Sequence, residues 1–504
     1  MSDKLIPEKS PEAPPKKRPG KLASFNNWIS FSGVVIATGS LFAFMLLFAI
    51  DAMTGHSNPY MGILTYLGSP MFLTIGLFLM VLGWFIHRRH LKSQARASIL
   101  TVSMDLSSPR DRRNLLIFSV SAILFMLLTA LGSYQTYHYT ESVQFCGQVC
   151  HEVMEPEYTT YLQSPHARVA CVECHIGSGV NWYVKAKISG LRQVYAVLTN
   201  DFDRPVDTPI ANLRPAQDTC EQCHWPQKFT GNLDRTYVHY LIDEENTPFF
   251  VRMLLKVGGG DPRHGPVDGI HWHTNKENKV EYVAVDDDRQ EIPWVRMTDK
   301  DGKVTVYKLE DYELDAAAEI RTMDCMDCHN RPAHVYTTPN DYVDQSIFMG
   351  RLSRELVDVK FNTVDLLTAE YENREEAQKA IEEGMTDYYE DEESLPQVIA
   401  EVKRIYSQSF FPEMKASWKD YPENIGHKDW PGCFRCHDGK HVSSDTGAAI
   451  SITASDCNSC HTIIAQGEEL EARVLDSRGL EFAHPDGEWD EELLCSDCHN
   501  GALQ

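Results

Sequence analysis

The sequence predicts a mainly α-helical protein, in which a three-helix membrane anchor precedes a large extramembrane domain with little regular secondary structure and a small β insertion. Three observations support this fold class. Three long runs near the N-terminus carry no charge, all fourteen cysteines fall into short motifs after these runs, and one later segment alternates apolar and polar residues. With 504 residues, 43% hydrophobic and 24% charged, the chain has the composition of a folded protein.

The three uncharged runs cover residues 28–50, 60–86 and 114–137. A helix of about 20 apolar residues crosses a bilayer, so each run is long enough to span it. The first run is too long for the core of a signal peptide and has no A-x-A-like cleavage site after it, so we expect it to be retained. We therefore expect residues 27–137 to form three transmembrane helices in contact with the lipid bilayer.

The basic residues around these runs predict the orientation of the anchor. Lys and Arg are frequent in the tail 1–26 and in the loop between the second and third runs, whereas the loop 51–59 has none. Under the positive-inside rule the tail and the second loop are cytoplasmic, and the chain lies outside from about residue 138 onward. The Pro- and Lys-rich tail 1–26 is expected to be disordered. The protein is thus predicted to be a multi-pass protein of the cytoplasmic membrane.

Charge is distributed unevenly along the chain. The formal net charge is -25, with 47 basic and 72 acidic side chains. Residues 1–137 carry a net +7, and the remaining residues carry -32. Because phosphate binding needs a basic surface, this composition argues against nucleic acid as a partner.

Seven motifs contain all the cysteines, and a histidine directly follows the second cysteine of each. The first motif has three residues between its cysteines, and the other six have two. In chain order the motif residues are Cys146, Cys150 and His151; Cys171, Cys174 and His175; Cys220, Cys223 and His224; Cys325, Cys328 and His329; Cys433, Cys436 and His437; Cys457, Cys460 and His461; Cys495, Cys498 and His499.

The C-x-x-C-H pattern is the attachment signature of c-type haem. Its thiols bond to the porphyrin vinyl groups, and its histidine is an axial ligand of the iron. Zinc sites pair C-x-x-C motifs without needing a histidine after each one, and no cysteine here is left over for a separate disulfide. We therefore expect seven covalently bound haem c groups. Haem c is attached outside the cytoplasmic membrane, in agreement with the side that the charge pattern predicts.

Further histidines could supply second axial ligands. Nine that belong to no motif lie in the predicted external part: His166, His239, His264, His271, His273, His334, His427, His441 and His484. Ligation by two histidines lowers the haem potential and closes the position that substrate chemistry would need. For the three motifs in residues 425–504, the spare histidines are His427, His441 and His484. Met154, three residues after His151, is an alternative ligand for the first haem.

Residues 138–335 resemble the NapC/NirT/NrfH family of membrane-anchored tetrahaem quinol dehydrogenases. The matching stretches are CGQVCHEVM at the first motif, PEYTTYLQSPHARVACVECH at the second and CMDCHNRPAH at the fourth. Three runs and seven motifs exceed the one helix and four haems usual in that family. The whole chain resembles instead the ImcH-type inner-membrane cytochromes of metal-respiring bacteria, which implies a bacterial inner membrane and a periplasmic haem domain.

The resemblance also implies residue roles. His334 would ligate the second haem, His239 the third, His166 the fourth and Met154 the first. The family motif has two residues between its cysteines, and its Met is two residues after the His, so the first motif departs from it. The family's quinol site uses a lysine and an acid, for which Lys185, Lys187 and Gln193 are the candidates here. Because Gln193 stands where the acid is expected, Asp201 and Asp203 are alternatives.

The remaining residues are expected to form three further parts. Residues 240–320 have no cysteine and contain strand-like alternation around a DKDGK turn, which predicts a β-rich insertion. One of its histidines, His264, His271 or His273, could ligate a haem, and a small metal site is a weaker alternative. Residues 336–424 read as an acidic helical connector, and residues 425–504 as a trihaem domain.

The sequence thus favours a membrane-anchored quinol dehydrogenase that passes electrons to a soluble periplasmic cytochrome, with a basic one favoured by the acidic surface. The resemblance implies menaquinol or another quinol as the substrate, and anaerobic respiration of extracellular metal as the setting. Two alternatives stay open. The chain could be an electron conduit without its own quinone site, or it could run in reverse and reduce quinone. A terminal reductase is less favoured because two-histidine ligation leaves no open iron position.

Overall fold

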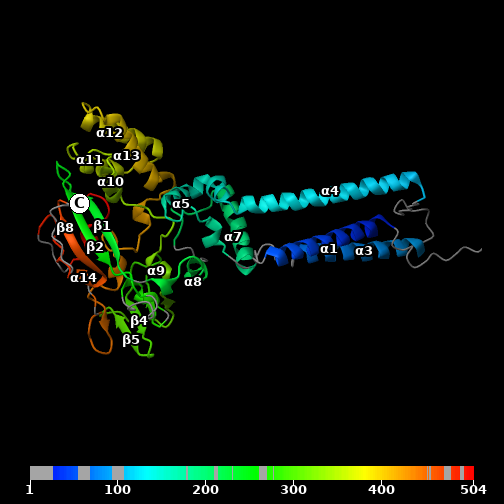
Figure 1. Cartoon of the computed structure of the whole chain (residues 1–504), viewed down its shortest axis with the longest axis horizontal. Coiled ribbons are helices and arrows are strands. Elements are labelled where there is room, and N and C mark those ends of the chain that lie inside the picture. The colour runs from blue at the N-terminus through cyan, green and yellow to red at the C-terminus, as the bar shows by residue number, and fades with distance from the viewer. Residues whose placement is uncertain are drawn as a thin grey trace, which may run out of the picture. The chain divides into compact units, whose positions relative to one another are not determined.

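A computed structural model of the chain describes residues 27–54, 68–92, 107–177, 180–208, 214–229, 231–259, 269–275, 277–450, 452, 456–469, 478–487 and 493–503. The tail 1–26, which is expected to be disordered, lies outside these residues. The chain divides into two compact units, Met1–His138 with Ser178–Val184, and Tyr139–Gly177 with Lys185–Gln504. We describe each unit separately (Figure 1).

Three long helices make up most of the described first unit: α1 (Trp28–Thr54), α3 (Ser69–Lys92) and α4 (Pro109–Thr140). Within the described residues, two stretches rather than three qualify as membrane spans by length and apolar composition. These are Trp28–Met45, with a mean hydropathy of 1.7, and Ser69–Ile86, with 2.0. The third predicted span falls on α4, many of whose side chains lie outside the described part. The part of the anchor that the structure describes therefore has two candidate spans.

Small residues let α1 and α3 pack closely. A Cβ atom added to Gly33 would lie 2.6 Å from the Gly76 carbonyl oxygen, so only glycine permits this approach. Further along, the Asn27 amide donates to the Gly83 carbonyl at 3.1 Å, and the Ser30 hydroxyl donates to that of Met80 at 3.1 Å. Close backbone approach with hydrogen bonds between helices is typical of helices associated in lipid.

Each cysteine motif in the second unit occupies a single helical turn. The first lies on a π-helical turn (Phe145–Val149) that leads into α5 (His151–Gln163). The second is α6 (Cys171–His175), which precedes α7 (Val180–Thr199), and the third begins a 3-10 turn (Cys220–Gln222) after α8 (Ala216–Thr219). The other four are α9 (Cys325–Cys328), a 3-10 turn (Gly432–Arg435), α14 (Cys457–Cys460) and α15 (Cys495–Cys498). Further 3-10 turns are Pro226–Lys228, Ile270–Thr274, Pro412–Met414 and Trp418–Asp420.

Two antiparallel sheets connect the predicted β insertion to the C-terminal part of the chain. In the first sheet the order is β1-β2-β8, and in the second it is β6-β3-β4-β5-β7. The strands are β1 (Leu233–Tyr240), β2 (Pro248–Leu255), β3 (Lys279–Val283), β4 (Trp294–Thr298), β5 (Val304–Lys308), β6 (Arg321–Thr322), β7 (Val442–Ser443) and β8 (His461–Gly467). Because β7 and β8 lie in residues 425–504, that part is hydrogen-bonded to the insertion and does not stand apart.

Four helices form the region expected to be an acidic connector: α10 (Pro339–Phe348), α11 (Val359–Thr368), α12 (Arg374–Tyr389) and α13 (Leu395–Ser409). They contribute most of the largest hydrophobic cluster in the described residues, including the fully buried Val343, Leu367, Ile381 and Ile405. In α12, Ala377, Ile381 and Met385 recur at a spacing of four and face this core, whereas its glutamates lie outside. The helices are thus a packed structural layer beside the haem motifs.

Candidate haem-binding sites

Local capping shapes the turn that carries a motif, as the fourth motif illustrates. The Asp324 carboxylate caps α9 by accepting from the Met326 backbone N–H at 2.8 Å. The buried Asp327 carboxylate accepts from the Asp324 N–H at 2.6 Å, from the Arg321 guanidinium at 2.6 Å and from the Tyr282 hydroxyl at 2.7 Å. A capping box together with this charged network fixes the turn, and hence the direction of Cys325, Cys328 and His329.

Six of the seven motif histidines face a histidine from another part of the chain. The ring centroids of each pair are separated by 5.8–6.3 Å. The pairs, motif histidine first, are His175 with His334 (6.3 Å), His224 with His166 (6.0 Å), His329 with His271 (6.3 Å), His437 with His273 (5.8 Å), His461 with His427 (6.2 Å) and His499 with His484 (6.0 Å).

This spacing fits an iron atom between two imidazoles. A nitrogen ligand stands about 2 Å from a transition metal, so the centre of its ring is about 3 Å away. Two imidazoles on opposite sides would then have centroids about 6 Å apart, as each pair does. Direct ring packing would not explain why each of these six non-motif histidines faces the histidine of a different motif. The residues therefore fit haem with two axial histidines.

Hydrogen bonds orient four of the non-motif rings. In each case the Nδ1–H group faces a backbone carbonyl oxygen, at 2.7–2.9 Å. The donor and acceptor residues are His166 and Pro332, His271 and Val257, His273 and Ile270, and His334 and Glu157. Donation from Nδ1 leaves the Nε2 lone pair free, and this arrangement is typical of metal-binding histidines.

Burial keeps most of these imidazoles neutral, which is the form that binds metal. It lowers the pKa of His175, His273, His329, His427, His437 and His499. Burial, with smaller effects of His427 and Lys256, lowers the pKa of His461 to about 4. His334 is different. Burial lowers its pKa, but the Glu157 carboxylate, 3.0 Å from Nδ1, raises it overall.

Several predicted ligands lie elsewhere than expected. His166 faces His224 of the third motif, not the fourth. His239 lies 3.2 Å from the Asp344 carboxylate instead of facing the third motif. His441 is 1% exposed, and both its nitrogens are engaged, Nδ1 with Asp438 at 2.8 Å and Nε2 with the Ile292 carbonyl at 2.7 Å. His334 faces the second motif, for which it was predicted, and His427 and His484 face motifs within residues 425–504.

His271 and His273 face two motifs for which other histidines were predicted. Both lie on the 3-10 turn Ile270–Thr274 inside the β insertion and face the fourth and fifth motifs. The sequence showed a cluster, HGPVDGIHWH, without showing which member was used. The signal that could have identified them is their spacing. His271 and His273 are two residues apart, so one short turn can present a histidine to each of two successive motifs. His264 lies outside the described residues.

The first motif differs from the others in its backbone. Its extra residue is accommodated by the π-helical turn Phe145–Val149, and inserted single residues commonly produce such turns. The His151 side chain lies outside the described part. Met154 follows three residues later in α5.

Neighbouring motifs along the chain are also neighbours in space. The Cys146 and Cys171 thiols, from the first and second motifs, lie close enough to act on each other's pKa, as do those of Cys220 and Cys325 from the third and fourth. Smaller electrostatic effects of the same kind link the remaining successive motifs, through Cys174 and Cys220, Cys328 and Cys433, Cys460 and Cys433, and Cys495 and Cys457. Each motif thus lies near the next one along the chain.

The quinol-site candidates do not all come together. Lys187 of α7 forms a salt bridge with Glu141, the residue that directly follows α4. Both charges act on the Cys146 thiol, so the pair lies at the first motif. The sequence analysis missed Glu141 because the residue precedes the first motif. Gln193, six residues after Lys187, is about 240° further round the helix and faces elsewhere.

The other candidates have different surroundings. Lys185, two residues before Lys187, is exposed and about 160° away round α7. Asp201 and Asp203 follow the helix and are exposed. Of the acids considered, Glu141 alone lies against a candidate lysine among the described residues, and it is 9% exposed.

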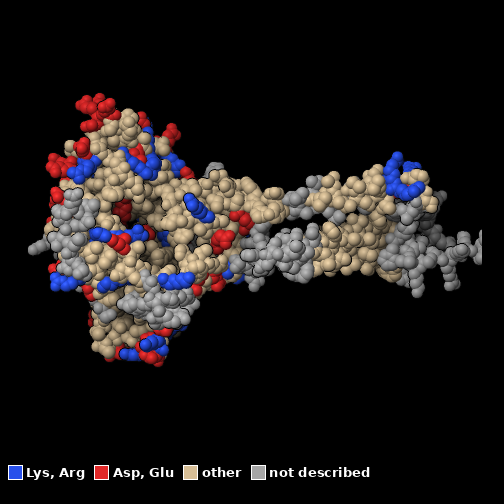
Figure 2. Space-filling model, viewed as in Figure 1, with Lys and Arg blue, Asp and Glu red and all other residues tan. Residues whose placement is uncertain are grey.

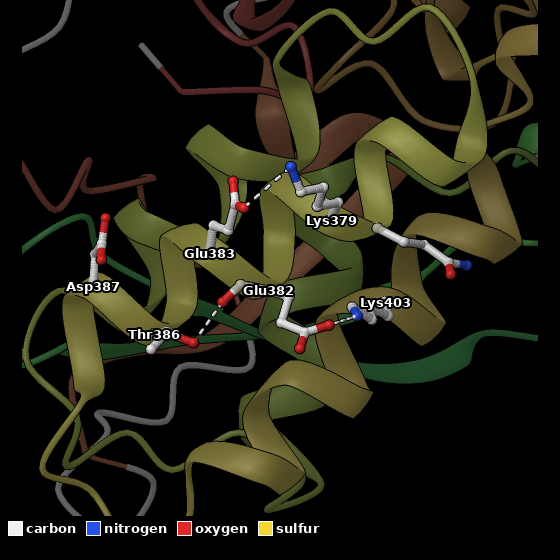
Figure 3. A pocket seen from close by; sticks show the side chains of 7 residues that line it. Lys379, Glu382, Glu383, Thr386, Asp387 and Lys403 are labelled. Atoms are coloured by element: carbon white, nitrogen blue, oxygen red, sulfur yellow. Dashed lines mark hydrogen bonds and ion pairs between the residues drawn. The ribbon is translucent and has the colours of Figure 1, made fainter.

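Two further clusters hold no haem motif. His239, Asp341 and Asp344 lie close enough to surround a metal ion, but lysines already neutralise the two carboxylates, Lys360 at 2.7 Å from Asp344 and Lys428 at 3.1 Å from Asp341. A pocket on α12 and α13 is lined by Gln378, Lys379, Glu382, Glu383, Thr386, Asp387 and Lys403 (Figure 3). Its lysines point toward its glutamates, and it contains no cysteine, histidine or aromatic ring.

Comparison with known proteins agrees with this geometry. The N-terminal region of the NapC/NirT cytochrome c family matches residues 108–209. The cytochrome c-type protein ImcH of Geobacter sulfurreducens is 43% identical over 507 residues, which cover 97% of each chain. The cytochrome c-type protein NrfH of Wolinella succinogenes is 30% identical over 129 residues, which cover 25% of this chain and 71% of NrfH. No solved structure matches. The chain therefore belongs to the NapC/NirT family of membrane-anchored c-type cytochromes, which carry covalent haem c, and it resembles ImcH over nearly its whole length.

Proposed function

We propose that the chain is a seven-haem quinol dehydrogenase of the bacterial inner membrane. The observation that carries this proposal is the ion pair between Lys187 and Glu141 beside Cys146 of the first motif. Oxidation of a quinol releases protons together with electrons, so a carboxylate next to the first member of a redox series can accept a proton, and a cation beside it can bind a quinol oxygen.

Each member of the pair would have a separate role. The Lys187 ammonium would donate a hydrogen bond to one quinol oxygen and orient the ring. The Glu141 carboxylate would accept a hydroxyl proton, and its Oε2 atom is buried without a hydrogen-bond partner among the described residues. Oxidation of one quinol to quinone releases two protons, which would leave on the outer side, and two electrons, which enter the series one at a time. General-base assistance of this kind contributes about 10²–10⁴-fold to a rate.

The six histidine pairs would hold six of the haems, with His151 or Met154 ligating the first. When bound, the haems supply the one-electron chemistry, and the protein sets their order and potentials. The chain's own contribution is to hold the seven motifs in an unbroken series from Cys146 to Cys498. This order would lead electrons away from the Lys187–Glu141 pair toward the C-terminal motifs.

The composition of the helices supports a proposal for how the chain crosses the membrane. We propose that α4 is the third span, since its run 114–137 has no charge. A basic group marks the end of α4 that begins at Pro109 (Figure 2), in agreement with a cytoplasmic position for this end. The second unit would then lie in the periplasm. Its excess of acidic residues would attract a basic soluble cytochrome in a chain of anaerobic respiration, with extracellular metal as the final acceptor.

Anaerobic stopped-flow mixing of the purified, haem-loaded protein with a menaquinol analogue tests the proposal. We expect rapid haem reduction in the wild type and about 100-fold slower reduction in Glu141→Gln, with unchanged reduction by dithionite. Asp203→Asn is the matched control and should behave as the wild type. If quinol reduces no haem in the wild type while dithionite reduces all of them, the chain is a conduit fed by another complex.

A further inference from the structure

Helix α7 carries an apolar stripe that no described residue covers. Ile188, Leu191, Tyr195 and Leu198 recur at spacings of three and four residues, so they share one face of the helix. Their exposed fractions are 64%, 73%, 64% and 81%, and Val194 beside them is 50% exposed. On the opposite side, Ala186, Gly190 and Val197 are partly buried. A contiguous exposed apolar surface on one side of a helix marks an interaction site.

The charges of α7 have one sign. Its charged residues are Lys185, Lys187 and Arg192, and it contains no acid. This composition is unusual in a part of the chain where acidic residues greatly outnumber basic ones. Helices with an apolar face bordered by basic side chains lie in the interface of membranes that contain anionic lipids.

One ion pair places α7 beside the residue that follows α4. In the second unit, Lys187 is paired with Glu141, which directly follows the end of α4 at Thr140. The stripe begins at the next residue, Ile188. A helix tied to the outer end of a proposed span cannot stand far from the lipid surface.

We infer that α7 lies in the outer membrane–water interface, with the stripe from Ile188 to Leu198 in contact with lipid and its basic side chains at the phospholipid headgroups. The inference rests on the proposed assignment of α4 as a span. It gives α7 a function beyond carrying Lys187, because the helix would hold the first motif against the bilayer that contains the quinol.

Cysteine accessibility in phospholipid nanodiscs that contain anionic lipid tests this inference. In the haem-loaded full chain we introduce Leu191→Cys, or Gln193→Cys as the matched control, and react each variant with a polymer-linked, membrane-impermeant maleimide. Both positions are exposed, and they lie about 160° apart round the same helix. The motif thiols are consumed by haem attachment, so the unsubstituted protein provides the background.

We expect the cysteine at 191 to react at least about tenfold more slowly than the cysteine at 193 in nanodiscs, and both to react equally after unfolding. Leu198→Cys should be protected in the same way and replaces Leu191→Cys if that variant does not fold. Equal rates in nanodiscs would overturn the inference, as would protection that appears only when two copies share a disc. Labelling does not depend on quinol oxidation. If the cysteine at 191 is protected but quinol reduces no haem, the proposed quinol dehydrogenase activity is wrong and the inference about α7 stands.

Discussion

An imidazole binds iron only through a nitrogen whose lone pair is free. Counting the spare histidines in the sequence does not show which of them meet this condition. His441 was a candidate because residues 425–504 have three spare histidines for three motifs. Its two nitrogens are instead engaged by Asp438 and by the Ile292 carbonyl. His273, more than 150 residues before the fifth motif, takes the place beside His437. Sequence counting cannot show which nitrogen has another partner.

The two kinds of histidine should respond differently to substitution. His166→Ala removes the imidazole opposite His224, so we expect one haem to change from low to high spin and its potential to rise. His441→Gln should leave all haem spectra unchanged and lower the free energy of unfolding by about 1–3 kcal/mol, because buried hydrogen bonds are lost. Electron paramagnetic resonance and chemical denaturation measure the two effects. A high-spin signal in the His441 variant would contradict the pairing described here.

Glu157 should tune the potential of the haem at the second motif. Its carboxylate lies 3.0 Å from Nδ1 of His334, and the hydrogen bond makes this imidazole a stronger donor to iron, which favours the oxidised state. In Glu157→Gln the charge is lost, and we expect one potential to rise by about 40 mV, equivalent to about 1 kcal/mol for one electron. Spectroelectrochemical titration checks this. Glu155→Gln, two residues away on α5, is the control and should leave all seven potentials in place.

At the scale of elements, the sequence predicted those helices and strands whose formation depends on residues close together in the chain. The strands around DKDGK were foreseen because turn and alternation signals act over a few residues. The pairing of β8 with β2 was not foreseen, since it joins residues about 200 positions apart and no local pattern encodes it. The π turn at the first motif was visible only as one extra residue between Cys146 and Cys150.

This π turn depends on a glycine. Gly147 is buried, and a Cβ atom there would lie 2.3 Å from the Tyr158 ring. We expect Gly147→Ala to displace Tyr158 and to lower the free energy of unfolding by about 1–3 kcal/mol, with incomplete haem attachment at the first motif. Haem content per chain and thermal unfolding measure the two effects. Gly190→Ala in α7 is the control, because nothing lies within 4 Å of its added Cβ, and it should fold with full haem content.

At the scale of the whole molecule, charge is the property that sequence and structure describe alike. Acidic and basic groups spread over the visible face of the second unit, while the anchor helices are nearly free of them apart from the basic end of α4 (Figure 2). The sequence alone could not show which residues of this unit lie next to each motif. All six histidine pairs join residues from separate segments of the fold.

The net charge of -25 predicts how electron transfer to a partner depends on salt. We expect the rate constant for reduction of a lysine-rich soluble cytochrome c to fall at least about tenfold between 0.02 and 0.5 M ionic strength, as screening weakens long-range attraction. Stopped-flow absorbance measures the rate. Reduction of an uncharged dye is the control and should change little. A rate to the basic cytochrome that is independent of salt would rule out electrostatic steering.

The histidine pairs also carry information about biosynthesis. In five of the six pairs the non-motif histidine precedes its motif along the chain, and only His334 comes after the motif that it serves. A chain that emerges N-terminus first therefore presents the second ligand before most of the attachment cysteines arrive. A haem at Cys171 and Cys174 would instead lack its facing histidine until residue 334 has crossed the membrane. Among the six haems that these pairs would hold, this one would be the most open to foreign ligands and to oxygen during export.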